Sequence, residues 1–317
     1  MAADYTRTVT EVSLSLTNLT VSAIDNKGGY SDPFDTTLPE FITNVAVLNS
    51  INQPLVVGPV TDTYFSSVQL LLHMNGTQGS TVFTDSSPFP LVTTTFGNAQ
   101  INTTDSKFGG ASGLFDGSGD YVDIAATSGF DFGLGDFTVE FWVKTTFNMA
   151  GVTPYRRVIA PQVVTNIGEV FQIAHAGSPI SGAKFENAIE LITPLATGST
   201  VSTMQAINDN QWHHVAFARS SGTVKAFLDG VLKDSAADTN DYSVAGVNGF
   251  RLAGRGDLAA GTFFSGKLDD FRITKGVARY TGNFTPPSAQ FPDQGDVAVT
   301  IASALTPDWR KPYRDIG

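Results

Sequence analysis

Apolar and polar residues alternate in short runs along most of the chain. In DFTVEFWVK, Phe137, Val139, Phe141 and Val143 occupy every second position, which is the period of a strand with one buried face. Similar segments recur from about 63 to 292, bounded by Gly, Asn, Asp and Pro. No segment keeps a helical period, and residues 277–282 are the best candidate for a single helical turn. The pattern therefore predicts an all-β sandwich or barrel.

The stretch QWHHVAFARSSGTVKAFLDGVLKD, residues 211–234, contains two adjacent histidines. Because neighbouring strand residues point to opposite faces, His213 and His214 diverge and cannot bind one metal ion together. Ser-Ser-Gly and Asp229-Gly230 are tight-turn signals. The stretch is therefore predicted to be a meander of strands and turns, not a metal or catalytic site.

The amino-acid composition disfavours some partners and excludes some kinds of site. Charged residues make up 15% of the chain, apolar residues 41%, and the net charge is −11. An acidic surface disfavours nucleic acid and anionic membranes as partners. Cysteine is absent, which excludes disulfides and thiolate metal sites. The first residues lack a secretory apolar region, so we expect synthesis in a cytoplasm without export by a signal peptide.

Four segments in order resemble one known family. They are LLLHMNG with TDSSPFP, GLFDGSGDYVDI with DFTVEFWVK, WHHVA with FLDG, and FSGKLDDFRITKGVARYTGNFTPP. Together they resemble the laminin G-like, concanavalin A-like lectin and glucanase family over residues 63–292. The resemblance implies a jelly-roll sandwich of two antiparallel sheets, one of them concave. Members of this family commonly bind glycans or proteins, and some hydrolyse glucans.

Two extensions flank the predicted sandwich. Residues 1–62 contain an alternating stretch, TRTVTEVSLSLTNLTVSAI, and are predicted to form a β-rich arm or a small β module. Residues 293–317 end in LTPDWRKPYRDIG and are predicted to form an extended docking tail. Trp309, Arg310 and Tyr313 are its candidate partner-docking residues, because aromatic and arginine side chains anchor many interfaces.

Glycan binding would need aromatic side chains on the concave sheet or its rim, and the candidates are Tyr155, Tyr242 and Phe264. The alternative for each is a packed loop aromatic. Catalysis is not expected, because a retaining glycosidase needs two closely spaced carboxyl groups. The Glu-x-Asp-x-Glu spacing of glucanase relatives is absent at the glutamates, which are isolated or at non-matching spacing: Glu140, Glu169, Glu186 and Glu190.

The resemblance also suggests a structural calcium ion. In several family members such an ion links the opening Asp-Ser-Ser turn to the closing strand, and Asp85 and Asp270 stand at the matching positions. The alternative is that Asp85 caps its own turn while Asp270 faces Arg272 or solvent.

The absence of a signal peptide and of cysteine, the low charge content and the two extensions together resemble structural proteins of tailed bacteriophage particles. The first hypothesis is therefore a non-enzymatic virion protein, on the capsid or the tail. Its extensions would bind other virion proteins in a symmetric homo-oligomeric assembly while the sandwich faces outward. The alternative is a glycan-binding adhesin for a host surface, and a polysaccharide-cleaving enzyme is the third possibility.

Overall fold

The computed structural model describes residues 61–152, 155–162, 172–177, 184–192, 201–243 and 249–295, together with the backbone of 13–15 and 18–20. The chain divides into two compact units, Met1–Val57 and Gly58–Gly317. In the first unit, β1 (Ser13–Ser15) pairs antiparallel with β2 (Asn18–Thr20), inside the stretch predicted to form strands. The second unit contains the predicted sandwich.

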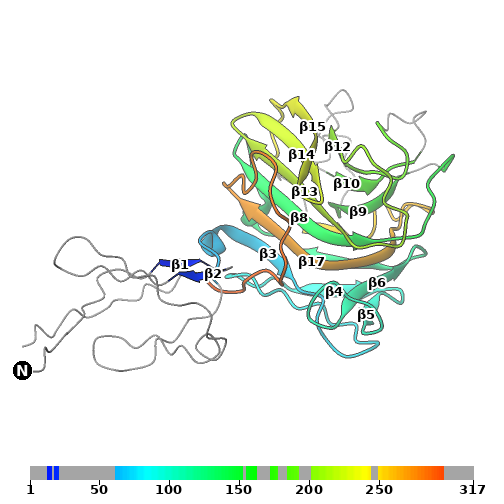
Figure 1. The fold of residues 1–317 in the computed structure, drawn as a ribbon. Helices are drawn as coiled ribbons and strands as arrows, with labels where there is room; N and C mark the ends of the chain where they lie inside the picture. The colour runs from blue at the N-terminus through cyan, green and yellow to red at the C-terminus, as the bar shows by residue number, and fades with distance from the viewer. Residues whose placement is uncertain are drawn as a thin grey trace, which may run out of the picture. The chain divides into compact units, whose positions relative to one another are not determined.

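The sandwich has two antiparallel sheets (Figure 1). The eight-stranded sheet has the order β15-β14-β13-β8-β17-β6-β5, and β3 also pairs with β17. Its strands are β3 (Val68–Leu72), β5 (Gln100–Asn102), β6 (Ser112–Asp116), β8 (Phe137–Lys144), β13 (His213–Ser220), β14 (Thr223–Leu228), β15 (Val231–Ala237) and β17 (Ser265–Lys275).

The seven-stranded sheet has the order β12-β11-β10-β9-β16-β7-β4. Its strands are β4 (Thr93–Phe96), β7 (Tyr121–Ala125), β9 (Arg156–Pro161), β10 (Gln172–His175), β11 (Ile189–Ile192), β12 (Val201–Ser202) and β16 (Gly249–Leu252). Two short 3-10 turns, η1 (Phe65–Ser67) and η2 (Ser128–Phe130), complete the described elements. The all-β prediction is therefore confirmed.

The core lies between the sheets and is built by the predicted alternation. Val139, Phe141 and Val143 of β8 are fully buried there with Val215 and Phe217 of β13. Stacked sheets bury their facing side chains in this way. The period-two pattern thus places the inner face of the central strands correctly.

The meander at 211–234 forms as predicted, with two tight turns. Ser221 and Gly222 join β13 to β14 with φ of 48° and 73°, and Asp229 and Gly230 join β14 to β15 with φ of 49° and 77°. Two consecutive residues at positive φ match the right-handed twist of a hairpin.

The outer face of the eight-stranded sheet is covered by the chain that follows β17. In Figure 1 this segment crosses in front of the sheet. Tyr280 and Phe284 pack on Ala216, Ala218 and Phe227, and Phe291 packs on Val68 and Leu71. The predicted helical turn at 277–282 is wrong. There, Tyr280 faces the sheet while Arg279 turns to Asp62, so tertiary contacts determine the backbone.

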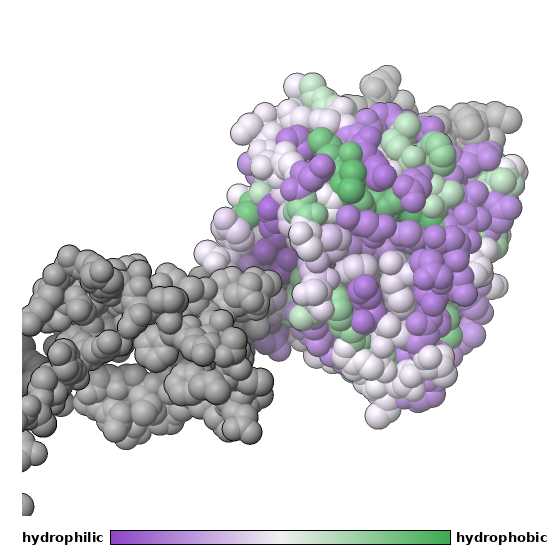
Figure 2. Space-filling model, in the orientation of Figure 1, coloured by the Kyte–Doolittle hydropathy of each residue, from purple (hydrophilic) through white to green (hydrophobic). Residues whose placement is uncertain are grey.

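The outer surface of the sandwich is mixed rather than uniformly polar. On the face shown in Figure 2, hydrophilic residues predominate and apolar residues form small separate patches. Among the described residues there is no long apolar helix that would cross a bilayer.

Candidate functional site

The covered face contains a buried network of charged side chains. Glu140 of β8 accepts hydrogen bonds from Arg272 Nε and Nη2 at 3.0 and 2.7 Å, and from Tyr280 Oη at 2.7 Å. Arg272 Nη1 donates to Asp62 at 3.0 Å, and Asp62 also binds Arg279 through both carboxylate oxygens. Two carboxylates and two guanidinium groups therefore compensate one another under the covering segment.

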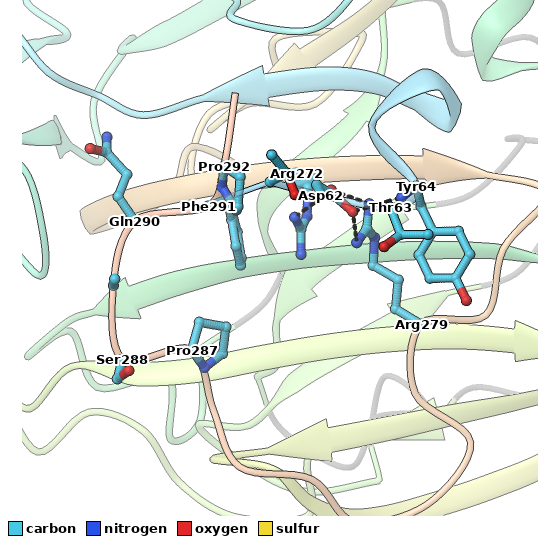
Figure 3. Close-up of a pocket in the computed structure, with 12 residues that line it drawn as sticks. Asp62, Thr63, Tyr64, Arg272, Arg279, Pro287, Ser288, Gln290, Phe291 and Pro292 are labelled. Atoms are coloured by element: carbon cyan, nitrogen blue, oxygen red, sulfur yellow. Dashed lines mark hydrogen bonds and ion pairs between the residues drawn. The ribbon is translucent and has the colours of Figure 1, made fainter. Parts of the chain in front are cut away.

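A pocket of about 410 Å³ lies beside this network (Figure 3). Its walls are residues 61–64 and 287–292, together with Arg272 and Arg279. Figure 3 shows Asp62 close to both arginines. The Arg272 guanidinium lies 3.7 Å from the ring centroid of Phe291. The charged groups of the pocket are thus occupied with one another, as expected where a chain segment is held to a sheet.

The two carboxyl groups of the network have lowered pKa values. Burial alone would raise the pKa of Glu140, but Arg272, His214 and Arg279 outweigh it and hold the pKa well below its usual range. The pKa of Asp62 is likewise lowered, because Arg279 and Arg272 outweigh the effect of burial. Both groups stay ionised at neutral pH, so neither acts as a general acid.

Among the residues that the structure describes, three other carboxyl groups have raised pKa values, and all three are buried. Burial is the main cause for Asp120, Glu190 and Asp269, and it raises the pKa of Asp269 to about 7. Each is at most 1% exposed. A carboxyl that a substrate cannot reach cannot act on it, so the raised values reflect burial rather than catalytic tuning.

Part of the seven-stranded sheet presents an open outer face. Along β7 the burial alternates strictly, with Val122 and Ile124 buried while Tyr121, Asp123 and Ala125 remain partly exposed. The edge strand β4 continues this face, and its Phe96 side chain is 39% exposed. The outer face is therefore open at β7 and at the edge strand β4, whereas all four residues of the neighbouring β16 are buried.

Aromatic rings form a row on the open face. Phe96 stacks on Tyr121 with centroids 4.6 Å apart, and Tyr121 is followed by Phe263 at 6.2 Å. The stack forms because Phe96 and Tyr121 are directly opposite in the β4–β7 ladder. Arg251 of β16 lies 4.2 Å from the Tyr121 centroid. We call Phe96, Tyr121, Asp123 and Arg251 the aromatic platform.

The polar part of the platform is held rigidly. Arg251 Nε and Nη2 bind the two oxygens of Asp123 at 2.7 and 3.0 Å. Arg251 Nη1 donates to the carbonyl oxygens of Arg255 and Gly256, both at 3.1 Å, and so fixes the loop at the rim. In that loop Arg255 and Asp257 lie 3.6 Å apart. Stacked rings beside fixed polar groups are typical of small-ligand sites.

Two of the three predicted glycan-binding aromatics are core residues, so those assignments are corrected. Tyr242 and Phe264 are 0% exposed. The Tyr242 hydroxyl donates to Asp238 at 2.8 Å and its ring packs against Phe137. Large aromatic side chains gain more from burial than from display. Tyr155 is partly exposed beside Arg157, whose guanidinium lies 5.5 Å from its ring, and it remains a candidate.

The contacts of Asp85 and Asp270 favour the alternative to a calcium ion. Asp85 accepts four hydrogen bonds, from the backbone N–H of Leu71, Ser87 and Leu91 and from the Ser87 hydroxyl. These bonds use the acceptor positions a metal would need. Asp270 is held by His73 Nδ1 at 2.7 Å and by a backbone N–H at 2.6 Å, not by Arg272. In the described part of the chain, no three acidic or histidine side chains gather as metal ligands.

The two histidines diverge as predicted. His213 binds Asp229 at 2.8 Å and Asp209 at 3.1 Å, whereas His214 is buried on the opposite face, 3.3 Å from Glu140. The side-chain hydrogen bond with Asp229 is the main cause that raises the pKa of His213. The predicted docking residues Trp309, Arg310 and Tyr313 lie outside the described residues.

The platform residues were missed at the sequence level. The alternation in YVDIA marks Tyr121 and Asp123 as outward-facing, but that signal recurs in many strands. Their partners lie on β4 and β16, at 93–96 and 249–252. Only the strand order brings the four side chains together.

The fold is thus an antiparallel β-sandwich with one outer face closed by its own chain and one partly open. The sequence matches the concanavalin A-like lectin/glucanases superfamily over residues 116–279, just over half of the chain. The chain belongs to this family. No curated protein matches the sequence.

Solved structures with a similar fold include two binding domains of toxins. The binding domain of Paraclostridial Mosquitocidal Protein 1 is 15% identical, with a TM-score of 0.49, and the match covers 68% of this chain and 50% of that one. The receptor binding domain of botulinum neurotoxin D is 16% identical, also with a TM-score of 0.49, covering 68% and 51%. The chain thus spans about half the length of these domains.

A third similar structure is domain 4 of AbnA, a GH43 extracellular arabinanase from Geobacillus stearothermophilus, in complex with arabinotriose. It is 18% identical, with a TM-score of 0.48, and the match covers 67% of this chain and 94% of that one. The family assignment itself rests on the sequence match.

Proposed function

We propose that this protein is a non-enzymatic glycan-binding module whose ligand stacks on the aromatic platform. Membership of a lectin and glucanase superfamily supports the ligand class. The single observation that carries the proposal is the exposed Phe96 ring, which extends the Tyr121 stack at an open sheet edge beside Asp123 and Arg251.

The chemistry of the platform suits a sugar ring. One face of a pyranose carries C–H groups, which are attracted to the electron-rich face of an aromatic ring. Its hydroxyl groups need hydrogen-bond partners at fixed positions, and the Asp123 carboxylate, held in place by Arg251, can accept from them. The sealed carboxyl groups at Asp120, Glu190 and Asp269 support binding without hydrolysis.

The test is a glycan array with the full-length protein and two matched variants. Phe96→Ala removes the exposed stacking ring, and binding should weaken about tenfold, equivalent to about 1.4 kcal/mol. Phe89→Ala is the control, because Phe89 is 70% exposed and lies outside the platform. Equal affinity of the two variants, or no binding of the unmodified protein to any glycan, would refute the proposal.

A structural role in a tailed-phage virion is the second candidate. It is favoured by one observation: the Asp62 N–H donates to the Gln294 carbonyl at 2.9 Å, so the two flanking segments join the sandwich side by side. Anchoring at that point would leave the platform face displayed. Light scattering of the full chain should then reveal a closed symmetric oligomer, and a monomer at micromolar concentration would contradict this role.

A further inference from the structure

We infer that the aromatic platform selects uncharged glycans and discriminates against sugars that carry a carboxylate. This inference rests on the proposed function and concerns the same site. It follows from which hydrogen-bonding positions of the platform are already occupied and which remain available.

The arginine of the platform is not available to an acidic ligand. Recognition of a carboxylate by arginine uses two parallel N–H groups on one edge of the guanidinium. That edge of Arg251 is occupied by Asp123, and Nη1 is occupied by two backbone carbonyls. Four of its five N–H groups are therefore used within the protein.

The remaining capacity of the platform is mainly that of an acceptor. Each oxygen of Asp123 accepts one hydrogen bond, from Arg251, and an ionised carboxylate oxygen has room for a second. Asp257 at the rim accepts a hydrogen bond from the Ala259 N–H and is 40% exposed in its side chain. Sugar hydroxyl groups are donors that match these acceptors, whereas a sugar carboxylate offers only further acceptors.

The charged groups near the platform also disfavour a ligand that carries a carboxylate. At the platform Asp123 is paired with Arg251, at its rim Asp257 lies 3.6 Å from Arg255, and the whole chain carries a net charge of −11. The next cation, Arg156, donates Nη1 to the carbonyls of Gly117 and Phe263, and its guanidinium lies 3.8 Å from the Phe147 centroid. A carboxylate placed on Phe96 would therefore meet arginines that already bind carboxylates, in a chain of net negative charge.

The experiment compares matched pairs of oligosaccharides by isothermal titration and on a printed array. Each pair is one galactose-terminated or glucose-based oligosaccharide and the same molecule with an added sialic or uronic acid. The unmodified protein should bind the neutral member at least tenfold more tightly. Its affinity for the neutral member should change less than twofold between about 50 and about 300 mM salt. Salt screens ion pairs over this range, and no ion pair forms between the protein and a neutral ligand.

Two variants test the cause. Asp123→Asn removes a charge and an acceptor and releases the paired edge of Arg251, so the preference for the neutral member should fall at least threefold. Asp257→Asn, on the exposed rim, should also lower the preference for the neutral member, but by a smaller factor. Because Asp257 is exposed, this variant still tests the inference if Asp123→Asn does not fold. Equal or tighter binding of acidic members by the unmodified protein would overturn this inference alone. Failure to bind either member of any pair would overturn the proposed function as well.

Discussion

The two outer faces of this sandwich differ in how much of their strands is covered. In β8 seven consecutive residues are buried, so both faces of the strand are covered. In β7 buried and partly exposed residues alternate, so only the core face is covered. The two strands belong to opposite sheets of the sandwich. The difference comes from a segment far along the chain, residues 276–295, which covers the first face and not the second.

The comparison shows that the charged side chains are more deeply buried on the covered face than on the open one. On the closed face Glu140 and Arg272 are almost fully buried, and Arg272 binds both Glu140 and Asp62. On the open face Asp123 and Arg251 form one pair that still borders solvent. Breaking a buried pair should therefore be far more damaging than changing the open face.

The largest effect is expected from Arg272→Met. The substitution leaves Glu140 buried without its main cation, and the free energy of unfolding should fall by about 3–5 kcal/mol. Urea denaturation followed by tryptophan fluorescence measures this loss. Lys184→Met is the control, because the Lys184 side chain is 37% exposed and its pair with Asp234 should contribute about 0–1 kcal/mol. A loss below 1 kcal/mol for Arg272→Met would contradict the account of the closed face.

A pH-dependent effect is expected at Asp269, another buried carboxyl on β17. Because the pKa is about 7 in the folded protein and near 3.8 otherwise, the folded state binds an extra proton between these values. The free energy of unfolding therefore falls as pH rises through this window. Asp269→Asn keeps an acceptor for the N–H groups of Lys107 and Phe108 but does not titrate.

Relative to the unmodified protein, Asp269→Asn should gain up to about 4 kcal/mol of stability between pH 4 and pH 7.5. Chemical denaturation of both proteins at several pH values measures the difference, and groups common to both cancel. A difference that stays constant with pH would show that Asp269 is not protonated in the folded state at pH 5.

The smallest effect is expected when one threonine on each face is replaced by valine. The Thr138 hydroxyl donates to the Val277 carbonyl at 2.8 Å and accepts from the Arg279 N–H at 2.9 Å, whereas Thr94 is exposed on β4. Thr138→Val should cost about 1–3 kcal/mol, because two partly buried backbone groups lose their partner. Thr94→Val should change stability by less than about 0.5 kcal/mol. Similar thermal melting shifts for both variants would remove the distinction between the faces.

The sequence predicted the inner face of the sandwich better than either outer face. Phe141 and Val143 were assigned correctly because a period of two is a local signal. For Tyr242 and Phe264 the alternative of a packed aromatic holds, and the sequence did not decide it because a loop aromatic looks the same in sequence whether it is packed or exposed. The contacts of Arg272 with Asp62 and Glu140 span 210 and 132 residues, and no local pattern reports pairings at such separations.

The platform was missed for the same reason. Phe96 and Tyr121 belong to neighbouring strands, but Arg251 joins them only through the strand order β16-β7-β4. The turns, in contrast, were predicted from two residues each, because Asp229-Gly230 and Ser221-Gly222 carry their own conformational preference. Local chemistry specifies the elements, and distant pairing determines which side chains form a site.

The hydrogen bond between the Asp62 N–H and the Gln294 carbonyl has a consequence for protein engineering. A sandwich whose two flanking loops are joined by a hydrogen bond at this point can be inserted into a surface loop of another protein without widening that loop. The same closeness allows a circular permutation, with a short linker joining 61 to 295 and new termini at the Ser221-Gly222 turn. The sandwich is therefore suited to use as a portable display scaffold.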